Sequence, residues 1–377
     1  MTEAGSPHRA WIEVDHDAIR HNLGAVRERA PAARVIAVVK ANAYGHGDVE
    51  VARTLRAEGV DELAVATVDE GQRLRAAGIG LPILVLWGVG PAEAAVVAAE
   101  GFEVIATDTS SVRLLESAAA DAGTRVGVHL KVDTGLGRQG AAPDEVGGLA
   151  ATIARSRHLR LAGTMSHLAV PGEDEAYTET QRLRMARALD AMRSAGIDPG
   201  LVHVSATSAI LAEDGGPADA VRPGLALYGL APAWAGAAAG NDLRPALSLK
   251  ARPLRLFDLA AGDPVGYGLR WRASRDTRIA TLGIGYGDGW PRAHANNGWA
   301  LVRGQRVPVV GAVSMDGLTV EIGEVAGVTY GDEFVLIGEQ ERARITADDV
   351  AAERRTINYE VTTALRGRLP RLHLGAA

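Results

Sequence analysis

The stretch VIAVVK, residues Val35–Lys40, distinguishes between the two common folds that alternate strands with helices. Its apolar and mostly β-branched run is typical of a parallel strand that is buried on both faces. A doubly wound, dinucleotide-binding sheet would place a glycine-rich turn directly after such a first strand. A lysine, Lys40, stands there instead. The sequence therefore favours a (β/α)8 barrel over an open sheet.

Seven similar apolar runs follow along the chain, and segments of helical character separate them. The runs are Glu62–Thr67, Pro82–Trp87, Glu103–Thr107, Gly127–Thr134, Leu161–Ala169, Leu201–Thr207 and Ala220–Gly229. The helical segments include Val49–Glu58, Glu70–Ala77, Ala92–Ala99, Ser111–Ala122 and Asp174–Ala195. A TIM-type barrel needs roughly 200 residues or more, and these units occupy about 230.

Beyond about residue 242 the pattern changes to short strands joined by turns. The expected strands are Leu247–Leu259, Thr277–Gly285, Ala300–Val310, Ser314–Ile322 and Glu333–Glu339, with helical periodicity only near Thr346–Glu353 and Val361–Arg366. We therefore predict an α/β chain with a TIM-type barrel over residues 1–240 and a mostly-β domain over residues 241–377. The segment AWAGAAAGND, residues 233–242, is the predicted linker.

Composition excludes several classes of protein. The 377 residues carry 40 basic and 46 acidic side chains, a net charge of −6, which argues against binding to nucleic acid. Glycine, proline and glutamate interrupt the longest apolar stretch, near residues 83–99, so we expect no membrane span. The N-terminal residues lack the apolar segment of an export signal, which predicts a cytoplasmic protein.

The absence of cysteine excludes further chemistry. A chain with no cysteine forms no disulfides, has no thiol nucleophile and cannot bind zinc through sulfur. No group of His, Asp and Glu residues shows metal-ligand spacing along the sequence, so we predict no metal. His46 and His203 are interpreted as structural histidines or as supports for other side chains.

A barrel places its reactive groups at the carboxyl ends of its strands. The groups at those ends are Lys40, Arg138, His167, Thr207 followed by Ser208, and Arg222 followed by Pro223 and Gly224. Burial would lower the pKa of Lys40, which suits an amine that forms a Schiff base, although a lysine at such a place can also extend into solvent. Hydroxyl and backbone N–H groups at the last two strands suit a phosphate. A lysine facing a phosphate site suggests pyridoxal 5′-phosphate.

Eight blocks of sequence resemble those of the alanine racemases, a family of fold-type III pyridoxal phosphate enzymes. The blocks are VVKANAYGHG (38–47), KVDTGLGRQG (131–140), MSHLA (165–169), VRPGLALYG (221–229), VGYG (265–268), IGYGDGWPR (284–292), VSMDG (313–317) and INYE (357–360). They occur in the family's order and span nearly the whole chain. The resemblance implies the barrel with a C-terminal β domain, a homodimer, and interconversion of L-alanine and D-alanine to supply peptidoglycan.

The resemblance also implies the catalytic roles. Lys40 would hold the cofactor as a Schiff base and act as one base, and Tyr267 of the other subunit would be the second base. Arg222 would contact the pyridine nitrogen, and His167 would support this cofactor-binding network. Racemisation removes a proton from one face of the α-carbon and returns one to the other face, so two bases on opposite faces are the simplest design. An arginine would leave the pyridine nitrogen unprotonated, because guanidinium does not give up its proton.

The resemblance implies that the remaining matched residues bind the phosphate, position the substrate or line its entry passage. Tyr44, Thr207, Gly224 and Tyr359 would hold the phosphate, Arg138 and Met315 would position the substrate carboxylate, and Tyr286 and Arg292 would line the passage by which substrate enters. Taken singly, each has a plainer interpretation: His167 as a hydrogen-bonded strand residue, Tyr286 and Tyr359 as packing aromatics, and Arg138 as a surface cation.

The chain departs from the family pattern at two places, and at a third it carries a residue that only some members modify. Ala206-Thr207 stands where the family often has Asn-Ser, so the phosphate hydroxyl comes from Thr207 or Ser208, and spacing to Arg222 favours Thr207. Ala312 replaces an arginine that many members have three residues before Met315, which bears on how strictly the substrate is chosen. Lys131 occupies the place of a lysine that some members carbamylate.

Three alternative functions share parts of this sequence pattern. A broader amino-acid racemase of the same fold, acting for example on serine, would share these motifs. A non-catalytic pyridoxal phosphate-binding protein would be a barrel alone, without the second domain that carries Tyr267. A decarboxylase of the same fold would be expected to use a cysteine from its second domain, and the chain has none.

Overall fold

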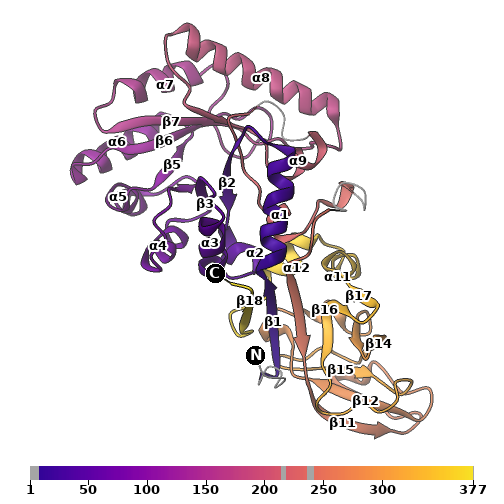
Figure 1. Ribbon diagram of the computed structural model, residues 1–377. Helices are drawn as coiled ribbons and strands as arrows, with labels where there is room; N and C mark the ends of the chain where they lie inside the picture. The colour runs from indigo at the N-terminus through magenta and orange to yellow at the C-terminus, as the bar shows by residue number, and fades with distance from the viewer. Residues whose placement is uncertain (1–7, 214–217, 236–241, 377) are drawn as a thin grey trace. The chain divides into compact units, whose positions relative to one another are not determined.

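The computed structural model of the protein describes residues 8–213, 218–235 and 242–376 (Figure 1). The chain divides into two compact units. We call residues 19–43 and 48–244 the barrel unit, and the residues up to 18 together with 44–47 and 245–376 the β-rich unit. The domain boundary predicted at 240/241 falls within residues 236–241, which lie outside the described residues, and the boundary stays a prediction.

The barrel unit contains a sheet of eight parallel strands among its described residues, in the order β8-β7-β6-β5-β4-β3-β2-β9. The strands are β2 (Arg34–Val38), β3 (Glu62–Val65), β4 (Ile83–Val85), β5 (Glu103–Ala106), β6 (Val126–Lys131), β7 (Leu159–Met165), β8 (Leu201–His203) and β9 (Ala220–Val221). A parallel bridge between Ala206 and Arg222 joins the chain beyond β8 to the chain beyond β9. The sheet thus closes on itself, and the predicted barrel with a mostly-β second unit is confirmed.

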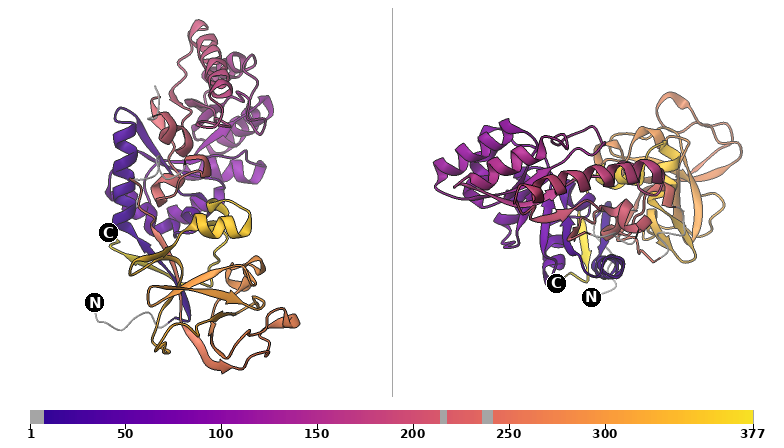
Figure 2. Two further views of the ribbon diagram at one scale, coloured as in Figure 1. Left: turned by 90° about the vertical axis from the view of Figure 1, so that its right-hand side faces the viewer. Right: turned by 90° about the horizontal axis from the view of Figure 1, so that it is seen from above.

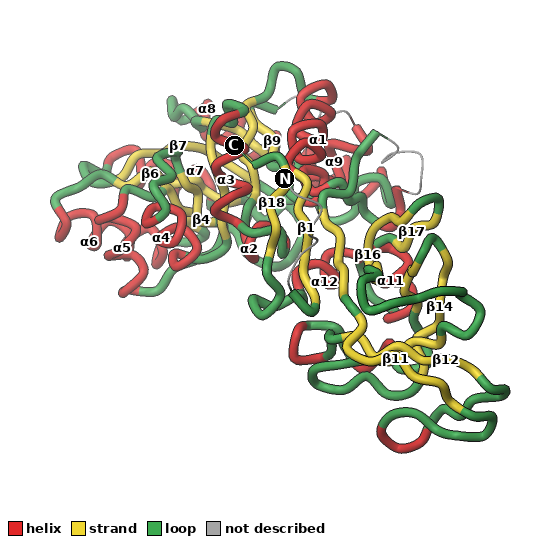
Figure 3. The backbone as a smooth tube through the Cα atoms, turned by 60° about the horizontal axis from the view of Figure 1, so that its bottom comes forward, coloured by secondary structure: helices red, strands yellow, loops and turns green. Residues whose placement is uncertain are grey.

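Helices follow the strands and lie on the outer side of the sheet, as Figure 3 shows for α4, α5 and α6. The helices are α1 (His16–Arg29), α2 (Lys40–Tyr44), α3 (Asp48–Ala57), α4 (Val68–Ala76), α5 (Pro91–Glu100), α6 (Thr109–Ala122), α7 (Val146–Arg155), α8 (Glu175–Ser194) and α9 (Thr207–Glu213), with the 3₁₀ helices η1 (Leu225–Tyr228) and η2 (Ala233–Ala235).

Local sequence sets the ends of these helices. Asp108 caps α6 by accepting from the Ser111 N–H at 2.7 Å, and Gly123 ends it at a φ of 64°.

The core of the barrel unit lies between the strands and these helices. Ile36, Leu63, Leu84 and Val104, from four neighbouring strands, have no exposed surface. Full burial of each such side chain contributes about 1.5–3 kcal/mol. Because the strands are buried on both faces, their sequences read as continuous apolar runs, which is the pattern that made them recognisable.

The β-rich unit, whose residues 245–376 are orange to yellow in Figure 2 and whose strand β1 is indigo, holds the second sheet. Its strands are β1 (Ala10–Asp15), β10 (Leu247–Ala251), β11 (Pro253–Leu259), β12 (Thr277–Leu282), β13 (Trp299–Val302), β14 (Gln305–Val310), β15 (Leu318–Glu321), β16 (Phe334–Gln340), β17 (Ala343–Ile345) and β18 (Arg371–Leu374). Its helices are η3 (Tyr267–Leu269), η4 (Tyr286–Asp288), η5 (Arg292–His294), α11 (Ala347–Arg354) and α12 (Asn358–Thr363).

This unit differs from the expected strands at several places. The expected run Ala300–Val310 is a hairpin, because Arg303 and Gly304 at its tip have φ angles of 50° and 69° and reverse the chain. Strand β1 was not among the expected strands; it pairs antiparallel with β10 and parallel with β18, which is labelled beside it in Figure 1. None of the described helices is long and apolar enough to cross a membrane.

Candidate functional site

Lys40 follows the carboxyl end of β2 and begins an unusual turn. Ala41, Asn42 and Ala43 have φ angles of 53°, 55° and 52°, in the left-handed region. Each such residue costs roughly 1–2 kcal/mol relative to a right-handed one. The Ala41 N–H donates to Oε1 of Glu70 at 2.7 Å, and the Ala43 N–H donates to the Val39 carbonyl at 2.8 Å. These bonds hold the strained turn, which sets where the Lys40 side chain starts.

Lys40 belongs to a cluster of basic groups at this end of the barrel. Burial lowers its pKa, and the charges of Arg138 and Arg222 lower it further, while Glu70 opposes them. Burial and the same arginines lower the pKa of Lys131 to about 8. A lowered pKa leaves more of each amine neutral, which is the nucleophilic form. The cluster also creates a positive field that attracts an anion.

Arg222 is the most constrained member of this cluster, with 3% of its surface exposed. Nη1 donates to Nδ1 and to the carbonyl of His203, both at 2.7 Å. Nη2 donates to the carbonyls of Ser166 and Val204 at 2.7 and 3.0 Å, and it lies 3.5 Å from Nδ1 of His167. These four short bonds use the four Nη hydrogens, so the Nε–H remains as the donor for a ligand.

Burial lowers the pKa of Arg222 to about 10, so the guanidinium still carries its charge at neutral pH. Burial, together with the charge of Arg222, lowers the pKa of His167 to about 3. His167 is therefore a neutral imidazole beside a fixed cation.

A chain of hydrogen bonds continues from Arg222 into the barrel. Because guanidinium can only donate, Nδ1 of His203 accepts, and the ring proton of His203 is on Nε2. That Nε2–H donates to Nδ1 of His129 at 2.7 Å, and the Nε2–H of His129 donates to Oε2 of Glu103 at 2.6 Å. The order of donors fixes both tautomers. The sequence pattern indicated only a structural or supporting role for His203, and it did not distinguish His129 or Glu103, which lie inside or at the start of apolar strands.

Thr207 and Gly224, two of the predicted phosphate ligands, lie together beyond β8 and β9. Oγ1 of Thr207 accepts from the N–H of Gly224 at 3.1 Å and from the N–H of Ala226 at 3.2 Å. All three residues are buried. The hydroxyl hydrogen of Thr207 stays available for an anion. This arrangement favours Thr207 over Ser208 as the ligand.

Arg138 lies in the glycine-rich loop after β6. Its guanidinium carbon is 5.3 Å from the ring centroid of Trp87, a cation–π contact. Asp133 shapes the loop by accepting from the N–H groups of Gly135 at 2.9 Å and Gly137 at 3.1 Å. The loop thus presents Arg138 at the same end of the barrel as Lys40, whose pKa it lowers.

The other predicted site residues belong to the β-rich unit. Tyr44 is buried, and its ring centroid is 6.3 Å from that of Tyr359. Burial, followed by the neighbouring Tyr359, raises the pKa of Tyr44, so its hydroxyl stays a neutral donor. The structure brings this predicted pair of phosphate ligands together within the unit.

Tyr267 is 76% exposed, in a turn between Gly266 and Gly268, which have φ angles of 80° and 73°. It lines a hollow of about 420 Å³ with Ala312 and Ser314. Met315, Tyr286 and Arg292 are also exposed. The catalytic and binding roles of these four exposed residues stay predictions.

Comparison with known proteins identifies the family. Models of the "Alanine racemase, N-terminal domain" and "Alanine racemase, C-terminal domain" match residues 14–232 and 246–373. The chain is 41% identical over 366 residues to an alanine racemase of Symbiobacterium thermophilum, covering 97% of each chain. It is 40% identical over 375 residues to alanine racemase 2 of Bacillus subtilis, covering 97% of this chain and 94% of the relative.

Solved structures agree with the family models. The alanine racemase of Streptomyces lavendulae has a TM-score of 0.92 at 34% identity over 99% of this chain and 98% of its own. That of Bartonella henselae, solved with covalently bound pyridoxal phosphate, has a TM-score of 0.86 at 27% identity over 98% of this chain and 100% of its own. Family models, relatives and fold all cover nearly the full length, from the lysine that follows β2 to the tyrosine of α12, so the chain belongs to the alanine racemases, a family of isomerases.

Proposed function

We propose that the protein is a pyridoxal 5′-phosphate-dependent alanine racemase, a cytoplasmic homodimer that interconverts L-alanine and D-alanine and supplies D-alanine for peptidoglycan. The observation that carries the proposal is the arrangement at Arg222, whose buried guanidinium has its four Nη hydrogens bonded and its Nε–H free to donate. Membership of the alanine racemase family supports the choice of substrate.

The donor groups on the barrel unit fit the proposed cofactor. Lys40 offers an amine with a lowered pKa, Arg222 offers a cationic donor for a ring nitrogen, and Thr207 with Gly224 offers a hydroxyl and a backbone turn for a phosphate. Tyr44 and Tyr359 would complete the phosphate site, and His167 would support Arg222. When bound, pyridoxal phosphate supplies an electron sink for the charge that forms on the substrate α-carbon.

The amine of Lys40 and the phenol of Tyr267 are the proposed bases. Lys40 would take or return the α-proton on one face of the substrate. Tyr267 would act on the opposite face of a site in the partner subunit, and the exposure of this residue supports that use. Arg222, held beside His167, is the proposed source of positive charge near the reacting groups.

The remaining polar residues position the substrate. Arg138 and Met315 would hold the substrate carboxylate, while Tyr286 and Arg292 would line the passage for substrate. Lys131 is buried, and its pKa of about 8 leaves a neutral fraction that can react with carbon dioxide, so we include its carbamylation in the proposal. The carbamate would place a negative charge beside Arg138. Intact mass measured under non-acidic conditions would detect the added group.

A broader amino-acid racemase is the second candidate function. The observation in its favour is the small side chain of Ala312, which lines the hollow beside Tyr267. Rates with alanine and serine, measured for wild type and Ala312→Arg, separate the two. Broad specificity predicts a wild-type kcat/KM for serine within about tenfold of that for alanine, and a selective loss of serine activity in the variant.

The proposed function is tested by racemisation of L- and D-alanine together with covalent attachment of the cofactor. Borohydride reduction followed by peptide mass spectrometry should locate pyridoxal phosphate on Lys40. The proposal fails if Lys40→Ala retains racemase activity, or if the cofactor is attached to another lysine.

A further inference from the structure

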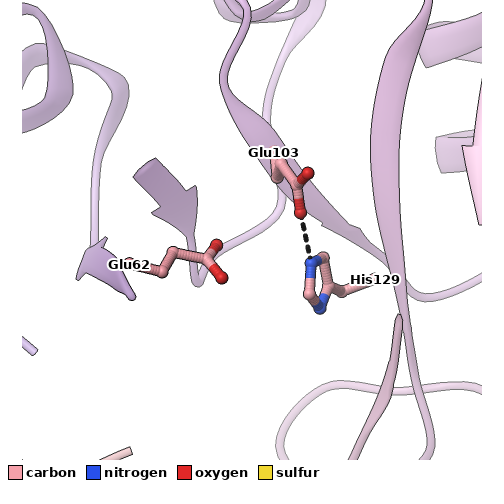
Figure 4. A group of neighbouring side chains, drawn as sticks. All are labelled: Glu62, Glu103 and His129. Atoms are coloured by element: carbon pink, nitrogen blue, oxygen red, sulfur yellow. Dashed lines mark hydrogen bonds and ion pairs between the residues drawn. The ribbon is translucent and has the colours of Figure 1, made fainter. Parts of the chain in front are cut away.

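Three side chains to which the proposed reaction assigns no direct part converge inside the barrel unit (Figure 4). Glu62 is the first residue of β3, Glu103 is the first residue of β5, and His129 lies within β6. One potential ligand atom from each lies within 4.8 Å of the other two. Since Glu62 and Glu103 begin parallel strands whereas Lys40 follows the end of one, this cluster and Lys40 are toward opposite ends of the barrel.

Glu62 is the residue of this cluster whose burial is not explained by the groups around it. It is 3% exposed, and its Oε1 atom has no hydrogen-bond partner among the residues that the structure describes. Figure 4 shows its carboxyl group directed toward Glu103 and His129. Burial, and then the charge of Glu103, raises the pKa of Glu62 to about 8. A buried carboxylate without a partner is costly, and either a proton or a bound cation removes that cost.

Glycine residues make the space that the cluster occupies. A Cβ atom on Gly127 would lie 2.9 Å from the carboxyl carbon of Glu103, and one on Gly163 would lie 2.7 Å from Nδ1 of His129. Any other residue at either position would push the polar side chain away. The backbones of β6 and β7 therefore allow a carboxylate and an imidazole to pack inside the barrel.

We propose that Glu62, Glu103 and His129 bind one divalent transition-metal ion, such as Zn²⁺, Mn²⁺ or Co²⁺. Two carboxylate oxygens and an imidazole nitrogen are the mixed donors that these ions accept, whereas Mg²⁺ and Ca²⁺ prefer oxygen alone. Ligands around a tetrahedral Zn²⁺ ion are about 3.4 Å apart. The three atoms, within 4.8 Å of one another, reach that spacing by small side-chain rotations.

The neighbouring ion pair selects the ligand atoms. Nη2 of Arg160 donates to Oε1 of Glu103 at 2.6 Å, which leaves Oε2 for the metal. Oε2 now accepts from Nε2–H of His129, so a cation at this point replaces the shared proton. Arg34 and Asp61 also act electrostatically on Glu62, with opposite signs, and with Arg160 they complete the charged surroundings that act on it.

Binding at Nε2 of His129 has a consequence for Arg222. The ring proton of His129 would move to Nδ1 and donate to Nε2 of His203, which places the proton of His203 on Nδ1, facing the Nη1 hydrogens of Arg222. A cation bound to His129 would therefore weaken the Arg222–His203 hydrogen bond, and that hydrogen bond would in turn weaken binding of the cation. The site is expected to bind with moderate affinity, and its occupancy to weaken the hold on Arg222. This inference does not depend on the proposed reaction.

Equilibrium dialysis of the full chain, as purified and treated with chelator, tests the proposal with Zn²⁺ as the probe. Wild type is expected to bind one more Zn²⁺ per chain than Glu62→Gln, or to bind it at least about tenfold more tightly. Glu58→Gln is the matched control, because Glu58 pairs with Arg20 in the same unit and is not one of the three proposed ligands. That variant should bind as wild type does.

Far-UV circular dichroism and thermal melting establish that each variant is folded, and Glu103→Gln serves if Glu62→Gln is not. Co²⁺ provides a second readout, since its visible absorption depends on direct ligands. Equal Zn²⁺ binding by wild type and the folded variants, or no binding by wild type at millimolar Zn²⁺, overturns the proposal and leaves Glu62 as a protonated carboxyl group.

Discussion

Nη1 of Arg222 donates a hydrogen bond of 2.7 Å to Nδ1 of His203, inside the barrel where both side chains are buried. The bond requires a neutral His203 with its proton on Nε2, and the His129–Glu103 pair accepts that proton's hydrogen bond. A side chain three hydrogen bonds from Arg222 thus helps to determine how the guanidinium is held. In our proposal Arg222 contacts the cofactor, so this chain of bonds bears on activity.

Replacing His203 by leucine should therefore reduce racemisation. The variant loses a hydrogen bond to a charged group and leaves one Nη1 hydrogen unpaired, which costs about 1.5–3 kcal/mol. If that cost falls on the transition state, kcat/KM for alanine drops about 10- to 100-fold. His158→Leu, in the bend before β7 of the same unit, is the control and should be near wild type. Wild-type kcat/KM in the His203 variant would show that the bond does not support Arg222 in catalysis.

Lys40 should be required both for attaching the cofactor and for proton transfer. Lys40→Ala is expected to lose covalent attachment and at least about 10³-fold in kcat, because a nucleophile and a base are removed together. Adding methylamine should restore part of the activity if the lost group acts as a base. The measurement is α-proton exchange into solvent, followed by mass spectrometry. Exchange at the wild-type rate without methylamine would contradict the assignment.

His167 should make stability depend on pH. Its folded-state pKa of about 3 lies below the ordinary value of 6.5, since burial and Arg222 disfavour the charged ring. Between these values the unfolded chain binds more protons than the folded chain, so the free energy of unfolding falls as pH is lowered. Below pH 6.5 wild type should lose about 1 kcal/mol per pH unit relative to His167→Gln. Urea unfolding at pH 7, 6 and 5 measures this difference, and parallel curves would contradict it.

Glu62 should destabilise the metal-free protein. Glu62→Met keeps the side-chain volume and removes an oxygen that has no partner among the described residues. We expect the free energy of unfolding to rise by about 1 kcal/mol in chelator at pH 8, where the wild-type carboxyl is partly ionised. Denaturant unfolding gives the value, with the partly exposed Glu58→Met as the control. A loss of stability in Glu62→Met would mean that the carboxyl has a partner in solution.

The sequence predicted the barrel strands because burial on both faces makes each strand a continuous apolar run. The sequence was less informative about strands that pair with segments far away in the chain. Strand β1 is completed by β10 and β18, which lie more than 200 residues away in the chain. Strand β9 is only Ala220–Val221, shorter than the expected Ala220–Gly229, because the chain turns at Gly224 into a 3₁₀ helix.

In the candidate site, too, local sequence pattern predicted some residues, whereas others come together only through the fold. Lys40 and Arg222 could be predicted because they end or follow apolar strands and lie in family blocks. Glu62, Glu103 and His129 could not, because each is a single polar residue in an apolar strand, and no spacing along the sequence links them. The parallel register of β3 to β6 brings them together, and glycines on β6 and β7 make the space.

The central claim is that Lys40 of one subunit and Tyr267 of the other serve a single site. A heterodimer of one Lys40→Ala chain and one Tyr267→Phe chain, purified through two different tags, tests it directly. One of its two sites then combines both substitutions and the other has neither, so the claim predicts about half of wild-type kcat from two nearly inactive parents. A pure heterodimer as inactive as its parent homodimers would contradict the claim.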